Sequence, residues 1–173
     1  MKRITVFLLI TCIICSVSGC TNSGRAQKVF EVKGYNLQMT ADRTFTDSTG
    51  GDFDLQITNE YSYIGIMGFN YSDLPKGLTQ MDIYDWQNDD FLSRRSNRKN
   101  IEKASTDAYP NYSITHSLYS AKKDGVENYY ASYLIDFPSD EVFAWVLVST
   151  TPSYFNSNRE YLHNIVCTIQ VPK

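Results

Sequence analysis

The stretch Val142-Phe-Ala-Trp-Val-Leu-Val148 decides the fold, because seven consecutive apolar residues leave a strand no face for water. Such a strand is buried on both sides in the middle of a sheet. The stretch Ser62–Tyr71 has the same character, with Met67 and Phe69 in one row and Ile64 in the other. A sheet with two strands of this kind needs further structure packed on both of its faces.

Short turns connect the strands around the first of these stretches. Lys123-Asp-Gly125 and Pro138-Ser-Asp-Glu141 have the composition of tight turns. They separate three predicted strands, Tyr112–Leu118, Asn128–Asp136 and Val142–Thr150. Strands joined by such short turns pair in antiparallel fashion. The C-terminal half therefore contains an antiparallel meander.

Two amphipathic stretches predict helices, one in the middle of the chain and one at its end. The first follows a helical N-cap at Thr79 and is expected to run to about Lys99, and the second covers Pro152–Gln170. Gly34–Thr40 and Phe53–Ile57 alternate as strands do. The predicted order is three strands, a helix, three strands and a helix. This order gives an α+β fold, an α/β/α sandwich with a mostly antiparallel central sheet of about six strands.

The charges of the first predicted helix follow its dipole. Acidic residues come early, and a basic group comes late, consisting of Arg94, Arg95, Arg98 and Lys99. The basic group would suit an acidic partner or phospholipid headgroups, but a solvated helix end also accounts for it.

Four elements resemble the PsbP-like superfamily. They are the strand Phe53-Asp-Leu-Gln-Ile57, the strand Ile64-Gly-Ile-Met-Gly-Phe69, the predicted helix from Thr79 and the closing helix. The resemblance covers residues 30–173. It implies a binding or assembly role, and it carries over no functional residue, because the superfamily shares no single active site.

The N-terminus has the pattern of an export signal. Lys2 and Arg3 precede an apolar run, Ile4–Val17, which is too short to span a bilayer and ends in Ser18-Gly19-Cys20. The spacing resembles that of bacterial lipoprotein signal peptides, which implies cleavage before Cys20 and its lipidation by acyl chains. The alternative is an ordinary secretory signal with Cys20 near the cut. The predicted organisation is a cleaved signal peptide (1–19), a lipidated tether (20–29) and a single globular domain (30–173).

Processing changes the composition of the chain. The 173-residue chain has a charge of −3, but the signal carries two basic residues and no acid. The mature chain therefore keeps 14 basic and 19 acidic side chains, a charge of −5, with Cys167 as its one remaining thiol. This negative charge, without an extended basic patch, excludes the function of a general nucleic-acid binder. The expected partners are the membrane, through the lipid anchor on the extracytoplasmic side, and an envelope protein.

The residues that could carry chemistry are few. No Gly-x-Ser-x-Gly motif is present, and the only histidines are His116 and His163. His116 is expected to be a hydrogen-bonded core or groove histidine. The outward face of the predicted closing helix carries Glu160, His163 and Cys167, and this group is an alternative metal or redox site. It offers too few ligands to complete a tetrahedral zinc site. The prediction is therefore a binding protein and not an enzyme, with no cofactor and no metal.

Tyrosine is the residue type that points to a binding surface. The chain has 13 tyrosines, and several gather in the predicted hairpin region. Exposed tyrosines are enriched at recognition surfaces, although cross-strand pairing on a wet sheet face also uses them. The predicted binding residues are Tyr112, Tyr119, Tyr129 and Tyr130.

Overall fold

The computed structural model describes residues 26–48 and 51–173. The predicted signal peptide and the lipidation site at Cys20 lie outside these residues. Neither helix of the described part has the length and apolar character needed to cross a membrane.

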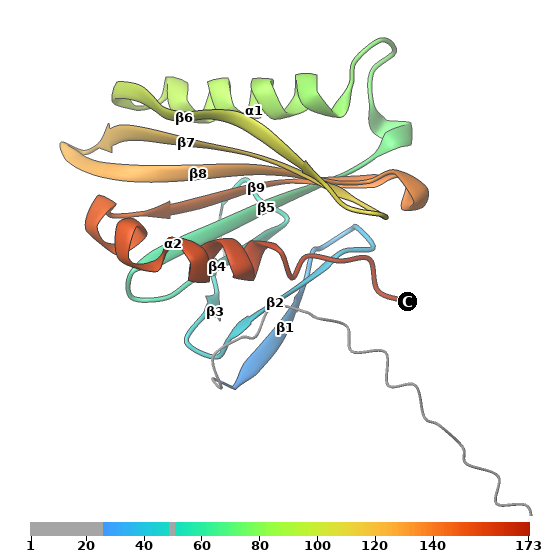
Figure 1. Cartoon of the computed structure of the whole chain (residues 1–173), viewed down its shortest axis with the longest axis horizontal. Helices are drawn as coiled ribbons and strands as arrows, with labels where there is room; N and C mark the ends of the chain where they lie inside the picture. Colours follow the sequence, from blue (N-terminus) through green and yellow to red (C-terminus); the bar gives the residue numbers. More distant parts are fainter. Residues whose placement is uncertain (1–25, 49–50) are drawn as a thin grey trace, which may run out of the picture.

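A seven-stranded antiparallel sheet forms the centre of the molecule (Figure 1). Its strands lie in the order β3-β4-β5-β9-β8-β7-β6. Their bounds are Thr46–Asp47 (β3), Leu55–Thr58 (β4), Ser62–Asn70 (β5), Ser96–Ala108 (β6), Ser113–Lys123 (β7), Val126–Phe137 (β8) and Val142–Thr150 (β9). Short 3₁₀ helices at Tyr71–Asp73 and Pro138–Asp140 follow β5 and β8.

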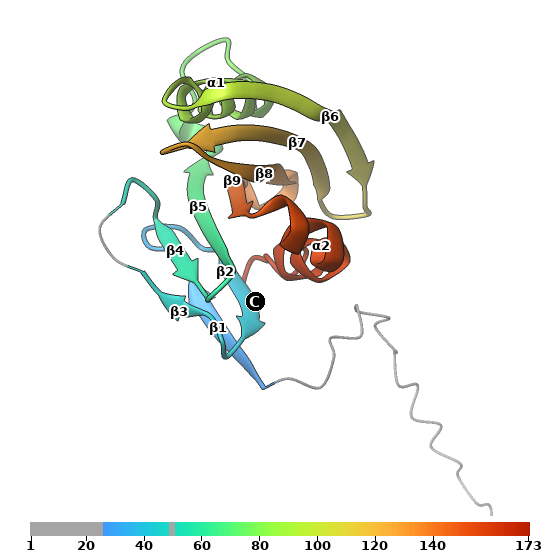
Figure 2. The ribbon, with the colours of Figure 1, turned by 90° about the vertical axis from the view of Figure 1, so that its left-hand side faces the viewer.

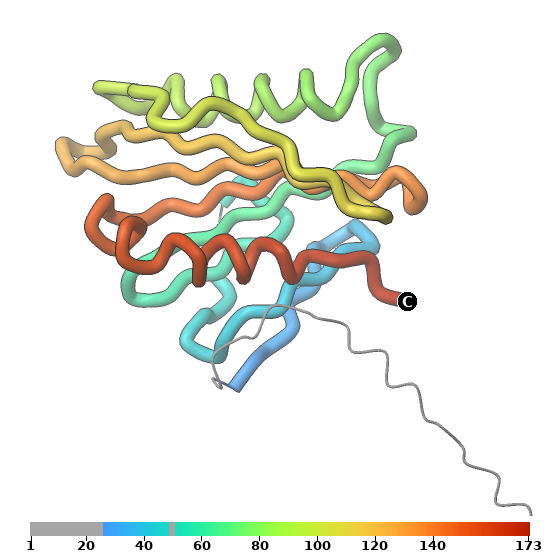
Figure 3. The backbone as a smooth tube through the Cα atoms, in the orientation of Figure 1, coloured from blue at the N-terminus to red at the C-terminus, as the bar shows by residue number. Residues whose placement is uncertain are grey.

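The two strands with apolar residues on both faces lie side by side in this sheet. β9 pairs with β5 on one edge and with β8 on the other (Figure 3). All of Val142–Val148 is buried, as the continuous apolar run predicts. The register of β5 and β9 sets Met67 opposite Trp145.

Helices cover both faces of the sheet (Figure 2). Helix α1, Gln80–Ser93, packs Ile83, Tyr84 and Leu92 against one face, and helix α2, Pro152–Val166, packs against the other. Thr79 and Asp82 form a capping box that begins α1. The predicted α/β/α sandwich is confirmed, with seven strands in place of about six.

A separate hairpin lies on the α2 side of the sheet. It consists of β1, Gln27–Glu31, and β2, Gln38–Asp42, and it pairs with the end of the chain through a bridge between Gln38 and Gln170. The sequence predicted only the second of these strands, shifted toward Gly34. Strand β1 therefore begins at Gln27, within the predicted tether (20–29).

The first predicted helix is too long at its C-terminal end. Helix α1 ends at Ser93, and residues 96–108 form the edge strand β6 instead of a helix end and a loop. Every residue of this strand except Glu102 is exposed, and its sequence carries no apolar alternation. Arg98 and Lys99 therefore lie in a strand and do not complement the helix dipole.

The second predicted helix is also too long. It ends at Val166 rather than Gln170, because the next N–H groups, of Thr168 and Ile169, bond to the carbonyls three residues back and the α-helical pattern stops. A non-helical residue, Asn158, interrupts the helix and shifts the faces of its two halves.

Candidate functional site

A concavity on the α1 side of the sheet is here named the α1 cavity. It encloses about 530 Å³, within the range of small-molecule sites. Its apolar wall consists of Phe53, Tyr63, Met67, Phe91, Tyr130 and Trp145. These residues come from four strands or their flanks and from the last turns of α1.

Aromatic contacts hold this wall together. Phe53 stacks on Trp145 with ring centroids 5.5 Å apart and an interplanar angle of 11°. Phe91 meets the edges of Tyr130 and Trp145, with centroids 5.3 and 6.2 Å away. Tyr63 meets Phe53 edge-on at 5.9 Å. Such offset and edge-to-face pairs stabilise a rigid arrangement of rings.

A buried hydrogen-bond network with Asn88 and Ser132 fixes the position of the Trp145 indole. Its Nε1–H donates to Ser132 Oγ (2.9 Å) and Asn88 Oδ1 (3.1 Å), and the Ser132 hydroxyl donates to the same amide oxygen (2.5 Å). Next to it, the Tyr84 hydroxyl lies 2.5 Å from Ser117 Oγ. These bonds join α1 to the sheet, so the wall is positioned before any ligand arrives.

Charged side chains form the rim of the α1 cavity. Arg94 binds Asp90 at 2.8 Å and lies 3.7 Å from Asp52. Arg95 stacks on Phe91, with its guanidinium carbon 3.3 Å from the ring centroid. Lys123 also lines the cavity. The rim thus carries both positive and negative side chains, and its two carboxylates, Asp52 and Asp90, are paired with Arg94.

The hydroxyl of Tyr63 is a neutral group in this wall. It donates to Gln56 Oε1 at 3.0 Å. Burial, and then the negative charge of Asp52, raises the pKa of Tyr63 to about 12. The phenol therefore remains protonated at physiological pH and acts as a hydrogen-bonding group.

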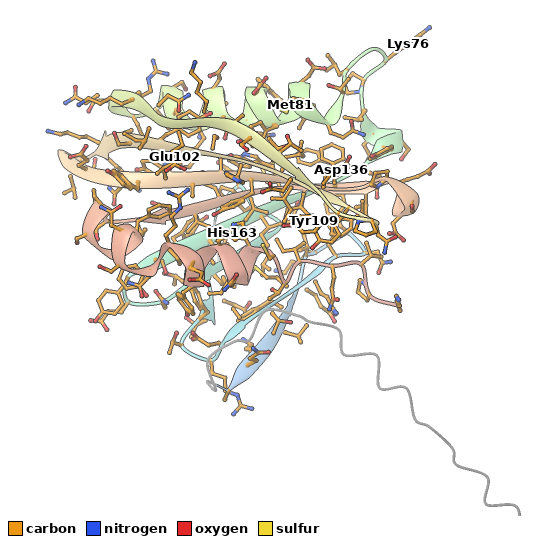
Figure 4. All side chains as sticks on the ribbon, viewed as in Figure 1. Lys76, Met81, Glu102, Tyr109, Asp136 and His163 are labelled. Carbon is orange, nitrogen blue, oxygen red and sulfur yellow. The ribbon has the colours of Figure 1, made fainter. Side chains whose placement is uncertain are left out.

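A second concavity lies between α2 and strands β6 to β8, and is here named the α2 cavity. It encloses about 510 Å³ and has a more polar lining. His116, Tyr133 and His163 meet there, with the two imidazole centroids 6.1 Å apart and Tyr133 about equally far from both. His116 lines this groove, and its Nε2 lies 3.5 Å from Asp107 Oδ2; the predicted hydrogen bond of this histidine stays a prediction. Glu102 and His163 approach this cavity from β6 and α2 (Figure 4).

Burial controls the ionisation of this second group. It lowers the pKa of His163, and the nearby His116 and Arg159 lower it further, whereas Asp107 opposes them. Burial also raises the pKa of Tyr133. His163 is therefore neutral at pH 7.

The predicted metal or redox group is only partly assembled. His163 Nε2 lies 3.3 Å from Cys167 Sγ, so the pair persists although the helix ends at Val166. However, His163 faces the α2 cavity rather than solvent, and Cys167 packs against the core. Within the described part of the chain, no three His, Cys, Asp or Glu side chains come together as metal ligands.

The four predicted binding tyrosines do not share one face. Tyr119 and Tyr130 are cross-strand partners on the α1 side, where Tyr130 lines the α1 cavity and is 1% exposed. Tyr112 and Tyr129 pack on the α2 side, the latter against Phe155. A single binding face made of all four is therefore wrong, because the strand period sends neighbouring residues to opposite faces.

Sequence reasoning missed most of the α1 cavity. The sequence shows that Phe91 and Arg95 are spaced by one helical turn. It predicts Met67 and Trp145 only as core residues of strands. Their proximity depends on the register between β5 and β9, whose paired residues are at least 72 positions apart along the chain. No local signal reports this register.

Comparison with known proteins places the fold. The structure matches cyanobacterial PsbP (CyanoP) from Synechocystis sp. PCC 6803 with a TM-score of 0.65, at 9% identity, over 90% of this chain and 99% of that one. The fold is PsbP-like. No sequence-family model matches the chain, and a search of curated proteins likewise gave no match.

Two further structures share this PsbP-like fold. The Ran-binding protein Mog1p from Saccharomyces cerevisiae matches with a TM-score of 0.56, at 11% identity, over 85% of this chain and 96% of that one. LpqN from Mycobacterium tuberculosis, described as involved in cell envelope biogenesis, matches with a TM-score of 0.58, at 8% identity, over 88% of each chain. At these identities the likeness establishes the fold alone.

Proposed function

We propose that the chain is a lipid-anchored extracytoplasmic protein whose PsbP-like domain is a non-enzymatic binding module. The observation that carries the binding role is the preformed α1 cavity, with an aromatic wall fixed by stacking and by the Trp145 hydrogen bonds. A concave apolar site with a few convergent polar groups is the usual form of a ligand site.

The charges of the cavity favour binding over acid-base chemistry. Asp52 and Asp90 are close to Arg94, and the Tyr63 phenol stays protonated. The histidines and Cys167 lie on the other side of the sheet. The cavity therefore offers contacts and charge rather than an oriented nucleophile and base.

The envelope location rests on the N-terminal sequence. The signal pattern ends at Cys20, and two or three acyl chains on this residue would anchor the protein stably. LpqN, which shares the fold, is described as an envelope biogenesis protein. The expected partners are the membrane, through the anchor, and an envelope component in the α1 cavity.

Fractionation tests the anchor. Cys20→Ala should move the protein from the membrane fraction to the soluble extracytoplasmic fraction, whereas Cys167→Ala should leave it in the membrane. Membrane retention of the Cys20→Ala protein would contradict lipid anchoring.

Photo-crosslinking in intact cells tests the binding role. A photoreactive phenylalanine at Gln87, on the rim of the α1 cavity, should give a reproducible adduct. The same group at Lys76, which projects from the loop before α1 (Figure 4), should not. No adduct at Gln87, or an equal adduct at Lys76, would contradict binding in this cavity.

A further inference from the structure

Arg95 has unused hydrogen-bonding capacity in the wall of the α1 cavity. Its guanidinium lies between aromatic rings, 3.3 Å from the Phe91 centroid and 5.0 Å from that of Tyr130. One terminal nitrogen donates to the Phe91 carbonyl, and Nε is buried without a hydrogen-bond partner among the described residues. A buried donor without a partner calls for an explanation, since such groups are rare in native proteins.

The charge balance around Arg95 is positive. Arg94 is engaged by Asp90 and Asp52. Arg95 and Lys123 both line the cavity, and neither forms an ion pair with another described residue. The chain as a whole has a net charge of −3, so this local excess of positive charge in the α1 cavity favours the binding of an anion there.

The rest of the cavity suits an apolar group. The stacked rings of Phe53 and Trp145 and the side chain of Met67 form a flat wall next to the arginine. An arginine that is held by aromatic stacking presents its planar donors in a fixed direction, which matches a carboxylate.

We propose that the α1 cavity binds a carboxylate with an apolar, preferably aromatic, body. The carboxylate pairs with Arg95, and the body lies against Phe53, Met67 and Trp145. This inference rests on the proposed function and adds the chemical class of the ligand. Two sources share this chemistry: a free aromatic acid, and the C-terminal aromatic residue of a peptide.

Calorimetry with matched probes tests the proposal on the full chain purified in detergent. The probes are 4-phenylbutyrate, 4-phenylbutyramide, and N-acetyl-Gly-Gly-Phe as its free acid and as its C-terminal amide. Each acid should bind at least about tenfold more tightly than its amide, because a charge-assisted hydrogen bond to the arginine is lost in the amide. The tighter of the two acids identifies the source.

Variants separate the arginine from the cavity. Arg95→Gln should weaken binding of the acids by about tenfold and leave the amides within about twofold. Arg98→Gln removes the same charge from exposed strand β6, outside the cavity, and should behave as the wild type.

Two outcomes would overturn the inference. Equal affinity for each acid and its amide would contradict the proposed carboxylate ligand, but it would not contradict binding in the α1 cavity. No heat with any of the four probes also overturns it, and the crosslinking at Gln87 then decides the proposed function separately.

Discussion

The ring of Phe53, which lies just before β4, lies flat on the indole of Trp145 in β9, with centroids 5.5 Å apart, although β5 lies between β4 and β9 in the sheet. The contact exists because β5 carries a glycine, Gly65, beneath the phenylalanine. A Cβ at this position would lie 2.6 Å from the Phe53 ring. One missing methyl group thus allows the segment before β4 to close the α1 cavity over the central strand.

Gly65→Ala should therefore displace Phe53 and open the α1 cavity. Overpacking of this kind costs about 1–3 kcal/mol of unfolding free energy. The chain has two tryptophans, so a Trp86→Phe background leaves Trp145 as the only fluorophore of this type. Its emission should shift to longer wavelength as the indole loses its cover.

Gly68→Ala is the matched control for this change. Its Cβ would lie 2.4 Å from Tyr35 on the opposite face of β5, so a comparable loss of stability is expected without a change in Trp145 emission. Equal emission shifts in the two variants would contradict the role of Gly65 in shaping the cavity.

Asn88→Ala should destabilise the protein by about 1–3 kcal/mol, because the buried donors on Trp145 and Ser132 lose their shared acceptor. The loss is measured by urea unfolding. Asn100→Ala, on exposed β6, should stay within about 0.5 kcal/mol of the wild type.

The same network should show coupling. The double variant Asn88→Ala/Ser132→Ala should lose less stability than the sum of the two single variants, by more than about 0.5 kcal/mol. Strict additivity would mean that the three groups do not act as one network.

His163 should titrate below its ordinary value of about 6.5, because burial disfavours its charged form. Between about pH 6.5 and the lower folded-state pKa, the unfolded chain binds more protons than the folded one. Stability therefore falls as pH falls through this window, and His163→Asn should flatten that slope. NMR titration of the imidazole protons and urea unfolding measure the two effects.

His116→Gln gives the control for this titration. Removing the neighbouring imidazole should raise the pKa of His163, because His116 lowers it, while Asp107, Arg159 and the buried environment stay in place. A midpoint for His163 at or above 6.5 in the wild type would refute the burial argument.

Glu102→Gln should loosen the edge strand β6 selectively. Arg159 of α2 donates two bonds to Glu102, at 2.6 and 2.5 Å, and the exposure of both groups limits their contribution to less than about 1 kcal/mol. Amide hydrogen exchange should accelerate in β6 and remain slow in β9. Glu160→Gln, a carboxylate change on the same helix, should alter neither strand, and uniform acceleration across the sheet would argue against a local tie.

The fold could be predicted because its centre is encoded locally. The apolar run of β9 and the turn at Lys123–Gly125 specify a buried meander without reference to distant residues. β6 could not be predicted in this way, because an exposed edge strand with charged residues carries neither apolar alternation nor turn signals.

The site was less predictable than the fold. Tyr130 is predicted from the sequence as a binding residue in an exposed cluster, whereas the structure buries it in the wall of the α1 cavity. Arg95 was interpreted as part of a basic helix end, and only the packing of α1 on β8 shows that it stacks on Tyr130. Strand register and helix packing are long-range properties that one sequence does not display.

Methionine-methyl NMR tests most directly the central claim that the α1 cavity binds an aromatic carboxylate. Of the four methionines, Met67 lines the cavity, Met39 is buried on the α2 side, and Met81 is partly exposed on α1. Titration of the full chain with 4-phenylbutyrate should shift the Met67 methyl signal to saturation and leave those of Met39 and Met81 in place. An unchanged Met67 signal, or equal shifts of all three, would contradict the account.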